Sequence, residues 1–227
     1  MNKYSHLAHE SDIGDAERLN WFRENYPVVA KAYQFASQAH AGQVRKFGGK
    51  PFFSHPERVA WRVACRLAYA TPVQGMSHPS VLVSASLLHD VLEDTDCTRE
   101  TLSQEFPEAV VSLVVELTNV KVPGLTREQQ KAEDHLRLRH VSLDARLIKL
   151  VDRLDNLLEL KDAPLVFVEK YHKETRHMLE AVFPDEFRTW DMPNCAHGKL
   201  VWDICNVLYG CPVVSREGNE MSDLPLD

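Results

Sequence analysis

Four side chains that could bind a metal or move a proton lie in the stretch LLHDVLEDT, residues 87–95. On a helix, His89 lies four residues before Glu93, while Asp90 lies three before Glu93 and four before Asp94, so all four occupy neighbouring faces. Carboxylates at these spacings repel one another unless a positive charge lies among them, and imidazole with carboxylate suits divalent manganese, iron or zinc. The stretch therefore indicates a metal site. An acidic, solvated helix end with an incidental histidine is the alternative.

A second polar cluster lies in KLVDRLDN, residues 149–156. At ~100° per residue, Lys149, Asp152 and Asn156 fall within about 60° of one another on a helix, with Arg153 close by. Leucines occupy roughly the opposite face. Alone, this pattern is typical of the solvent-exposed face of an amphipathic helix. The functional interpretation is that the polar face lines a cleft in which Asp152 completes a metal shell.

A basic, glycine-bearing loop, GQVRKFGGKPFF, carries Arg45 and Lys46 and is followed by His55 and Pro56. Adjacent cations in a loop favour a phosphate clamp, because guanidinium and ammonium groups offset phosphate charge. A basic surface loop before a helix start is the other interpretation. None of the three clusters decides the function by itself.

Helices must position these clusters, because apolar residues recur at helical spacing along the chain. Pro27 opens a helix that closes at Gly42, and Ser54 with Glu57 has the form of a capping box that begins the next helix. Pro79 opens a helix that we expect to continue through residue 94. Six further helices are expected: helices beginning at Thr98 and Pro107, a helix to about His140 that a Thr126–Gln129 capping box begins, and helices over 143–158, 164–182 and 199–209. No segment alternates strictly between turn signals, so the chain is predicted to be all-α.

The composition excludes several classes of protein. With 44% hydrophobic and 26% charged residues among 227, it is that of a soluble globular chain. It has no apolar run of membrane-spanning length and no signal-peptide core, so we expect a cytoplasmic protein. The net charge of −7 disfavours a nucleic-acid partner but is compatible with a small anionic ligand. Five scattered cysteines indicate neither a zinc knuckle nor a disulfide framework, and a homo-oligomer stays open.

Taken together, the motifs AHAGQVRKFGGKPFFSHP, LLHDVLEDT and LIKLVDRLDNL resemble, in order and separation, the HD hydrolase domain of the RelA/SpoT alarmone enzymes. The stand-alone small alarmone hydrolases are the most similar branch. The resemblance covers roughly residues 28–182. The upstream R-K…P…H-P block and the E-D after H-D-x-x are characteristic of this branch, and they imply an HD-domain helical bundle.

The resemblance also implies roles for single residues. Four positions match the ligands of a divalent metal, usually manganese, although other divalent metals are compatible: His55, His89, Asp90 and Asp152. Glu93 and Asp94 match the acidic pair that orients or activates the attacking water.

Substrate contacts follow in the same way. Arg45 and Lys46 match the loop pair that packs on the base and meets phosphate, and Asn156 matches a nucleotide contact, with Lys149 on the same helix face. The stretch KYHKETRHMLEAVFP resembles the following helix of the long enzymes, but the A-H-R-L-G ending of that helix is missing. Only Lys170 and Tyr171 are therefore carried over as substrate-side residues.

The resemblance also predicts how the chain divides into segments. We expect an N-terminal helical extension over 1–27, the HD hydrolase domain over 28–182, C-terminal helices packing on that domain over 183–210, and a disordered tail over 211–227. Nothing after residue 182 resembles a nucleotidyltransferase domain, so we expect hydrolysis without synthesis.

The expected activity is metal-dependent removal of the 3′-pyrophosphate from guanosine alarmones, ppGpp or pppGpp, to give GDP or GTP. Two alternatives stay open. One is hydrolysis of another nucleotide phosphoester, such as the 2′-phosphate of NADPH, the adenosine alarmone ppApp or a deoxynucleotide. The other is a catalytically inactive HD module that binds a nucleotide, although no proposed ligand and neither member of the E-D pair is lost here.

Overall fold

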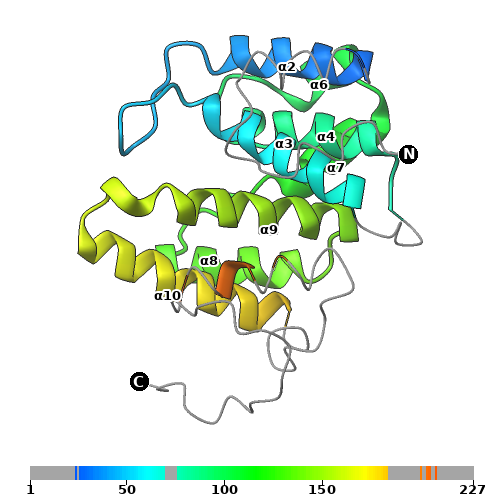
Figure 1. Ribbon diagram of the computed structural model, residues 1–227. Coiled ribbons are helices and arrows are strands. Elements are labelled where there is room, and N and C mark those ends of the chain that lie inside the picture. The colour runs from blue at the N-terminus through cyan, green and yellow to red at the C-terminus, as the bar shows by residue number, and fades with distance from the viewer. Residues whose placement is uncertain are drawn as a thin grey trace.

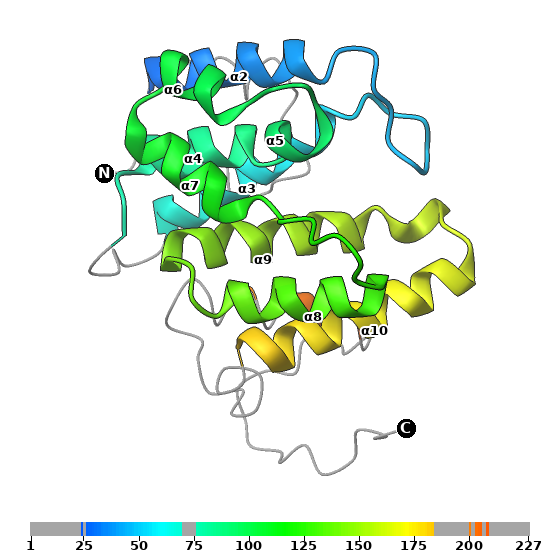
Figure 2. The ribbon, with the colours of Figure 1, turned by 180° about the vertical axis from the view of Figure 1, so that it is seen from behind.

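Helix α9 (Leu143–Leu158) separates two groups of helices (Figures 1 and 2). On one side lie α2 to α7, which fall within residues 27–117, and on the other lie α8 (Arg127–Leu138) and α10 (Leu165–Val182). The computed structural model describes residues 26–69 and 76–183, together with residues 24, 200, 203–205 and 208. Because α9 contacts both groups, its side chains can reach sites on either side.

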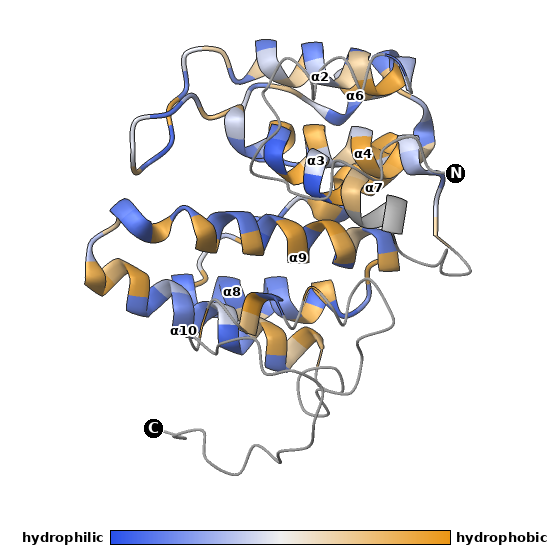
Figure 3. Ribbon diagram, in the orientation of Figure 1, coloured by the Kyte–Doolittle hydropathy of each residue, from blue (hydrophilic) through white to orange (hydrophobic). Residues whose placement is uncertain are grey.

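Helix α4 (Pro79–Leu88) forms the centre of the larger group. Every residue from 82 to 88 is buried, so this helix has no solvent-facing stripe, as expected for a core helix. It packs against α2 (Pro27–Ala39), α3 (Ser54–Tyr69) and α7 (Glu108–Leu117). Figure 3 shows the apolar character of α4 and α7. The tight packing around α4 fixes the position of the residues that follow it.

Helix α9 is amphipathic, as the leucine spacing predicted. Its buried apolar residues face the core, whereas its polar face carries Lys149, Asp152 and Asn156. Ser142 caps the helix, because its hydroxyl accepts a hydrogen bond of 3.2 Å from the Ala145 amide.

The helix expected over 79–94 is broken. Helix α4 ends at Leu88, and α5 (Val91–Asp94) begins after a turn at His89 and Asp90. The His89 ring donates to the carbonyl oxygen of Ser86 at 2.7 Å, a side-chain bond that competes with helix continuation. The break re-aims Asp90, so sequence spacing on one continuous helix does not describe this stretch.

Other local expectations have mixed outcomes. The capping box of Thr126 with Gln129 is formed at the start of α8. Ser54 is instead the first residue of α3, and its hydroxyl donates to the Pro51 carbonyl at 2.8 Å. Gly42 adopts φ 80° where the chain leaves α2, a left-handed conformation that favours glycine. The remaining short helices are α6 (Arg99–Glu105) and the 3-10 turn η1 (Leu160–Asp162).

The all-α prediction is confirmed. Within the described ranges every regular element is a helix, and the Val44–Pro51 bridge is isolated. None of these helices is long and apolar enough to cross a membrane.

The predicted terminal segments lie mostly outside the described residues. Nearly all of residues 1–27 and all of residues 211–227 lie outside the described part of the chain. Of 183–210, Leu200, Ile204 and Cys205 are buried against the common core. The expected division of the chain stays a prediction.

Candidate metal centre and active site

The Nε2 nitrogen of His89 faces two carboxylates. The ring is fully buried at the end of α4, and Nδ1 donates to Ser86. The other nitrogen, Nε2, is the one that faces the carboxylates, and in the neutral ring it carries a lone pair that can bind a metal. Asp90 Oδ1 lies 3.2 Å from Nε2 and Asp152 Oδ1 lies 3.8 Å away. These two carboxylates favour a proton on Nε2, and a divalent cation bound between the three atoms would take the place of that proton.

His55 approaches the same point from the start of α3. Its Nδ1 lies 2.8 Å from Asp155 Oδ2, and its Nε2 lies 3.0 Å from Asp152 Oδ1 and 3.9 Å from Asp90 Oδ2. A carboxylate that accepts from one imidazole nitrogen orients the other nitrogen, as is common behind metal-binding histidines. Asp155 therefore fixes the direction in which Nε2 points.

The four predicted ligands therefore converge from separate elements. The candidate ligand atoms of His55, His89 and Asp90 all lie within 4.8 Å of one another, and Asp152 on α9 contacts both imidazoles. Burial alone would lower the pKa of His89, but Asp90 and Asp152 outweigh it and raise the pKa to about 10. Burial would raise the pKa of Asp90, yet the two histidines hold it at about 2. The cluster thus favours positive charge at its centre, and its nitrogen and oxygen donors fit a divalent transition metal.

Glu93 is held beside this cluster by a residue that the sequence motifs did not indicate. The Asn119 amide donates to Oε1 at 2.8 Å, and its side-chain nitrogen donates to Oε2 at 3.2 Å. Burial is the main cause that raises the pKa of Glu93 above its ordinary value, while Lys149 on α9 opposes the rise. This half-buried carboxyl group is therefore a stronger base than an ordinary glutamate once it is ionised.

Asp94 ends α5 and is more exposed than Glu93. Burial, followed by repulsion from Asp90, raises its pKa. Its carbonyl oxygen accepts a hydrogen bond of 2.7 Å from the Gln43 side chain. The acidic pair is thus tied to the basic loop at one end and to Asn119 at the other.

Four predicted substrate residues share one pocket. This pocket of about 190 Å³ is lined by Arg45, Lys46, Asn156 and Tyr171, together with aromatic and apolar side chains from the loop, η1 and α10. Arg45 donates to Glu159 at 3.0 Å and to Asn156 Oδ1 at 2.5 Å, and its guanidinium lies 5.4 Å from the centre of the Phe52 ring. Burial raises the pKa of Tyr171 to about 12, so its hydroxyl stays protonated.

Asn156 connects this pocket to the candidate metal centre. While its oxygen accepts from Arg45, its nitrogen donates to Asp152 Oδ1 at 2.6 Å. A ligand in the pocket is therefore one side chain away from the His/Asp cluster.

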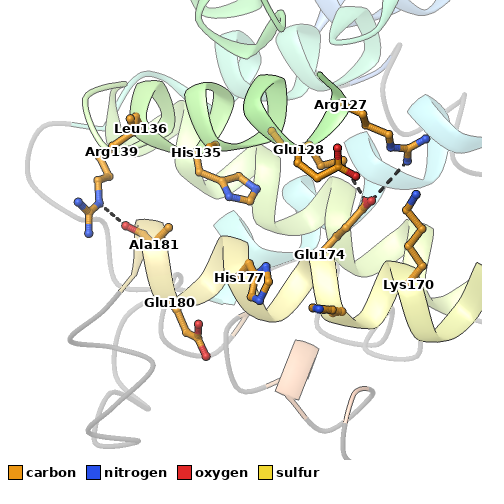
Figure 4. A pocket seen from close by; sticks show the side chains of 13 residues that line it. Arg127, Glu128, His135, Leu136, Arg139, Lys170, Glu174, His177, Glu180 and Ala181 are labelled. Carbon is orange, nitrogen blue, oxygen red and sulfur yellow. Dashed lines mark hydrogen bonds and ion pairs between the residues drawn. The ribbon is translucent and has the colours of Figure 1, made fainter. Parts of the chain in front are cut away.

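Two predicted substrate residues lie elsewhere. Lys149 acts electrostatically on Glu93, beside the acidic pair rather than in the pocket. Lys170 lines a separate groove of about 830 Å³ between α8 and α10, with Lys131 and Glu174 (Figure 4). Glu174 pairs with Lys131 at 3.0 Å in that groove. The adjacent sequence positions 170 and 171 thus point to different surfaces, because one residue turns a helix by ~100°.

Sequence reasoning missed the charged residues behind His55. Asp155 is 1% exposed and accepts bonds from Arg58 at 2.8 Å and from Arg62 at 3.3 Å. The two arginines follow His55 by three and seven residues, which places all three on one face of α3. That spacing, and Asp155 three residues after Asp152, were the signals that could have revealed this support.

An all-helical domain that gathers histidine and aspartate at a buried point belongs to the class of helical metal-binding domains. The chain is a member of the HD domain family, whose sequence model matches residues 32–183. Membership implies a divalent metal, and the His/Asp cluster offers suitable donors.

Relatives confirm the predicted branch. The mouse protein named guanosine-3′,5′-bis(diphosphate) 3′-pyrophosphohydrolase MESH1 is 38% identical over 134 residues, which cover 58% of this chain and 69% of that protein. An Aquifex aeolicus protein named guanosine-3′,5′-bis(diphosphate) 3′-pyrophosphohydrolase is 32% identical over 212 residues, or 92% of this chain. This chain spans only about a quarter (26%) of the length of the Aquifex protein.

A solved structure shows the same fold. The structure described as a metazoan ortholog of SpoT that hydrolyzes ppGpp matches with a TM-score of 0.64 at 24% identity. The match covers 79% of this chain and 93% of the other chain.

Proposed function

We propose that this chain is a metal-dependent hydrolase that removes pyrophosphate from the 3′ position of guanosine alarmones. Its substrates would be ppGpp and pppGpp, and its products GDP or GTP together with pyrophosphate. The names of the mouse and Aquifex relatives support the guanosine substrate. The observation that carries the proposal is the approach of His55, His89, Asp90 and Asp152 to one buried point.

The pocket beside Asn156 would bind the base. At about 190 Å³ it is smaller than the roughly 300–1,000 Å³ of pockets that enclose whole ligands, so the phosphates would extend out of it towards the cluster. Arg45 would offer its planar guanidinium to the purine, held in place by Glu159 and Asn156. Lys46 would offset phosphate charge.

The four candidate ligands would hold the cation, which supplies Lewis acidity at phosphorus and hydroxide near neutral pH. Glu93 would accept the proton of the attacking water, and Asn119 keeps the Glu93 carboxylate in place for this transfer. Asp94 would orient the same water. A new O–P bond forms at the 3′ phosphorus while the bond from phosphorus to the ribose 3′-oxygen breaks. That oxygen would take up the proton that Glu93 accepted from the water and leave as the 3′-hydroxyl of GDP or GTP, with pyrophosphate as the other product.

Manganese is the proposed ion. Two imidazoles and two carboxylates form a mixed nitrogen and oxygen donor set, whereas magnesium prefers oxygen ligands.

A substrate panel tests the function. The protein would be loaded with manganese and given ppGpp, ppApp or NADPH, while pyrophosphate and orthophosphate are measured separately. We expect pyrophosphate from ppGpp. Orthophosphate from NADPH without any product from ppGpp would assign the 2′-phosphatase alternative instead. Tight nucleotide binding without any product would indicate an inactive binding module.

A further inference from the structure

A hydrogen-bonded link joins the end of α2 to the end of α5. His40 Nδ1 lies 2.8 Å from Gln43 Oε1, and Gln43 Nε2 donates to the Asp94 carbonyl oxygen at 2.7 Å. The carbonyl can only accept, so the Gln43 amide nitrogen must face Asp94 and its oxygen must face His40. His40 therefore carries its proton on Nδ1 and fixes the orientation of the amide.

His40 is itself held firmly in place. It is 2% exposed, and its ring stacks on Phe52 with centroids 4.8 Å apart and planes at 29°. The remaining nitrogen, Nε2, is buried without a hydrogen-bond partner among the described residues. A buried polar atom without a partner costs free energy, and an apolar ring at this position would not carry that cost.

The acceptor of the link, the Asp94 carbonyl, lies at the end of a very short helix. Helix α5 has only four residues, and a helix leaves its last carbonyls without intrahelical partners. Gln43 satisfies the carbonyl of Asp94, the last residue of α5. The Gln43 backbone also belongs to the basic loop, since its carbonyl accepts from the Phe52 amide at 2.9 Å. One side chain thus joins the loop that carries Arg45 to the helix that carries the acidic pair.

We propose that Gln43, oriented by His40, is a positioning residue that holds α5 so that Glu93 and Asp94 face the candidate metal centre. Its role in turnover rests on the proposed function, because it acts through the acidic pair. Neither His40 nor Gln43 touches the reacting atoms in this account.

Gln43→Met tests the link, because methionine has a similar length but cannot donate to the Asp94 carbonyl. We expect kcat for ppGpp to fall about 10–100-fold with KM and metal content unchanged, because a displacement of about 1 Å costs up to ~10² in rate. His40→Phe, which retains a ring beside Phe52, should lower kcat in the same direction. The double variant should be no slower than Gln43→Met, since both act through one chain of hydrogen bonds. Gln34→Met, the same change at an exposed position of α2, is the matched control.

Hydrogen exchange gives a readout that does not need activity. The amides of Glu93 and Asp94, both bonded to the Asp90 carbonyl, should exchange faster in Gln43→Met than in Gln34→Met. Unchanged exchange at α5 would overturn the link, whatever the substrate proves to be. A raised KM at unchanged kcat would overturn it too, since Gln43 would then only shape the Arg45 loop. An inactive parent protein with faster exchange in the variant would keep the link and reject the proposed function.

Discussion

Asn156 Nδ2 donates a 2.6 Å hydrogen bond to Asp152 Oδ1, the oxygen that both imidazoles of the candidate metal centre approach. The other end of the same amide accepts from Arg45 in the adjoining pocket. A single side chain therefore fixes the distance between the group that would bind the base and the group that would bind the metal.

Asn156→Leu should uncouple base binding from metal binding, because the leucine side chain is similar in size and forms no hydrogen bonds. We expect KM for ppGpp to rise about tenfold, the effect of losing one bond to a charged group, with metal content retained. Steady-state kinetics and metal analysis on the same sample check this. An unchanged KM would show that the pocket and the cluster are not coupled through Asn156.

Arg45→Lys should weaken substrate binding and leave metal content unchanged. The guanidinium contacts Glu159 and Asn156 from one planar group, and lysine can offer neither the two-point contact nor the flat face. Equilibrium binding of ppGpp measures the change. Calcium would replace manganese in this experiment, because we expect turnover to be slower with calcium. Identical affinity in the variant would reduce the basic loop to a surface feature.

Asp155 should contribute to stability in a pH-dependent way. Burial would raise its pKa, but His55 and Arg58 outweigh burial and hold the pKa well below its ordinary value. Such a carboxylate adds stability that is present above the unfolded pKa of about 3.9 and is lost as the pH falls towards the folded value. Asp155→Asn should therefore lower the free energy of unfolding by about 3–5 kcal/mol at pH 7, as expected when one partner of a buried pair is removed.

The difference in the free energy of unfolding between the parent protein and Asp155→Asn should become smaller below about pH 4. Urea unfolding at pH 7, 5 and 3.5 checks this, with the exposed Asp96→Asn as the control. A difference that is constant with pH would contradict the assigned ion pairs.

Sequence periodicity was sufficient for most of the fold. The apolar spacing of α9 and the Thr126 capping box predicted their helices, because both signals are local. The break at His89 was not predictable in this way. The break coincides with a side-chain bond from His89 to Ser86, and the broken stretch lies beside Asp152, which belongs to another helix.

The candidate site was predicted unevenly for the same reason. The ligands follow short motifs, but their supports are distant in sequence: Asn119 lies 26 residues from Glu93, and Asp155 lies 100 residues from His55. Lys170 was assigned with its neighbour Tyr171, yet helical rotation places it in the groove between α8 and α10. Local patterns cannot specify which polar faces meet in space.

Chelation should abolish activity, and manganese should restore it better than magnesium. Metal that binds only the folded state also stabilises it, so manganese should raise the melting temperature of the chelator-treated protein. Asp90→Asn should remove most of that rise, because a neutral amide is a poorer ligand. Full activity in excess EDTA after prolonged dialysis would refute metal dependence.

The most direct test of the account is single-turnover pyrophosphate release from ppGpp, measured with metal content on Glu93→Gln and Asp90→Asn side by side. Glutamine is nearly isosteric and leaves the candidate ligands intact, so Glu93→Gln should keep its metal and bind ppGpp while turnover falls about 10²–10⁴-fold, the usual contribution of general acid–base catalysis. Asp90→Asn should lose metal and turnover together. A Glu93→Gln protein that releases pyrophosphate at the parent rate, or an Asp90→Asn protein that keeps both its metal and its activity, would contradict the account.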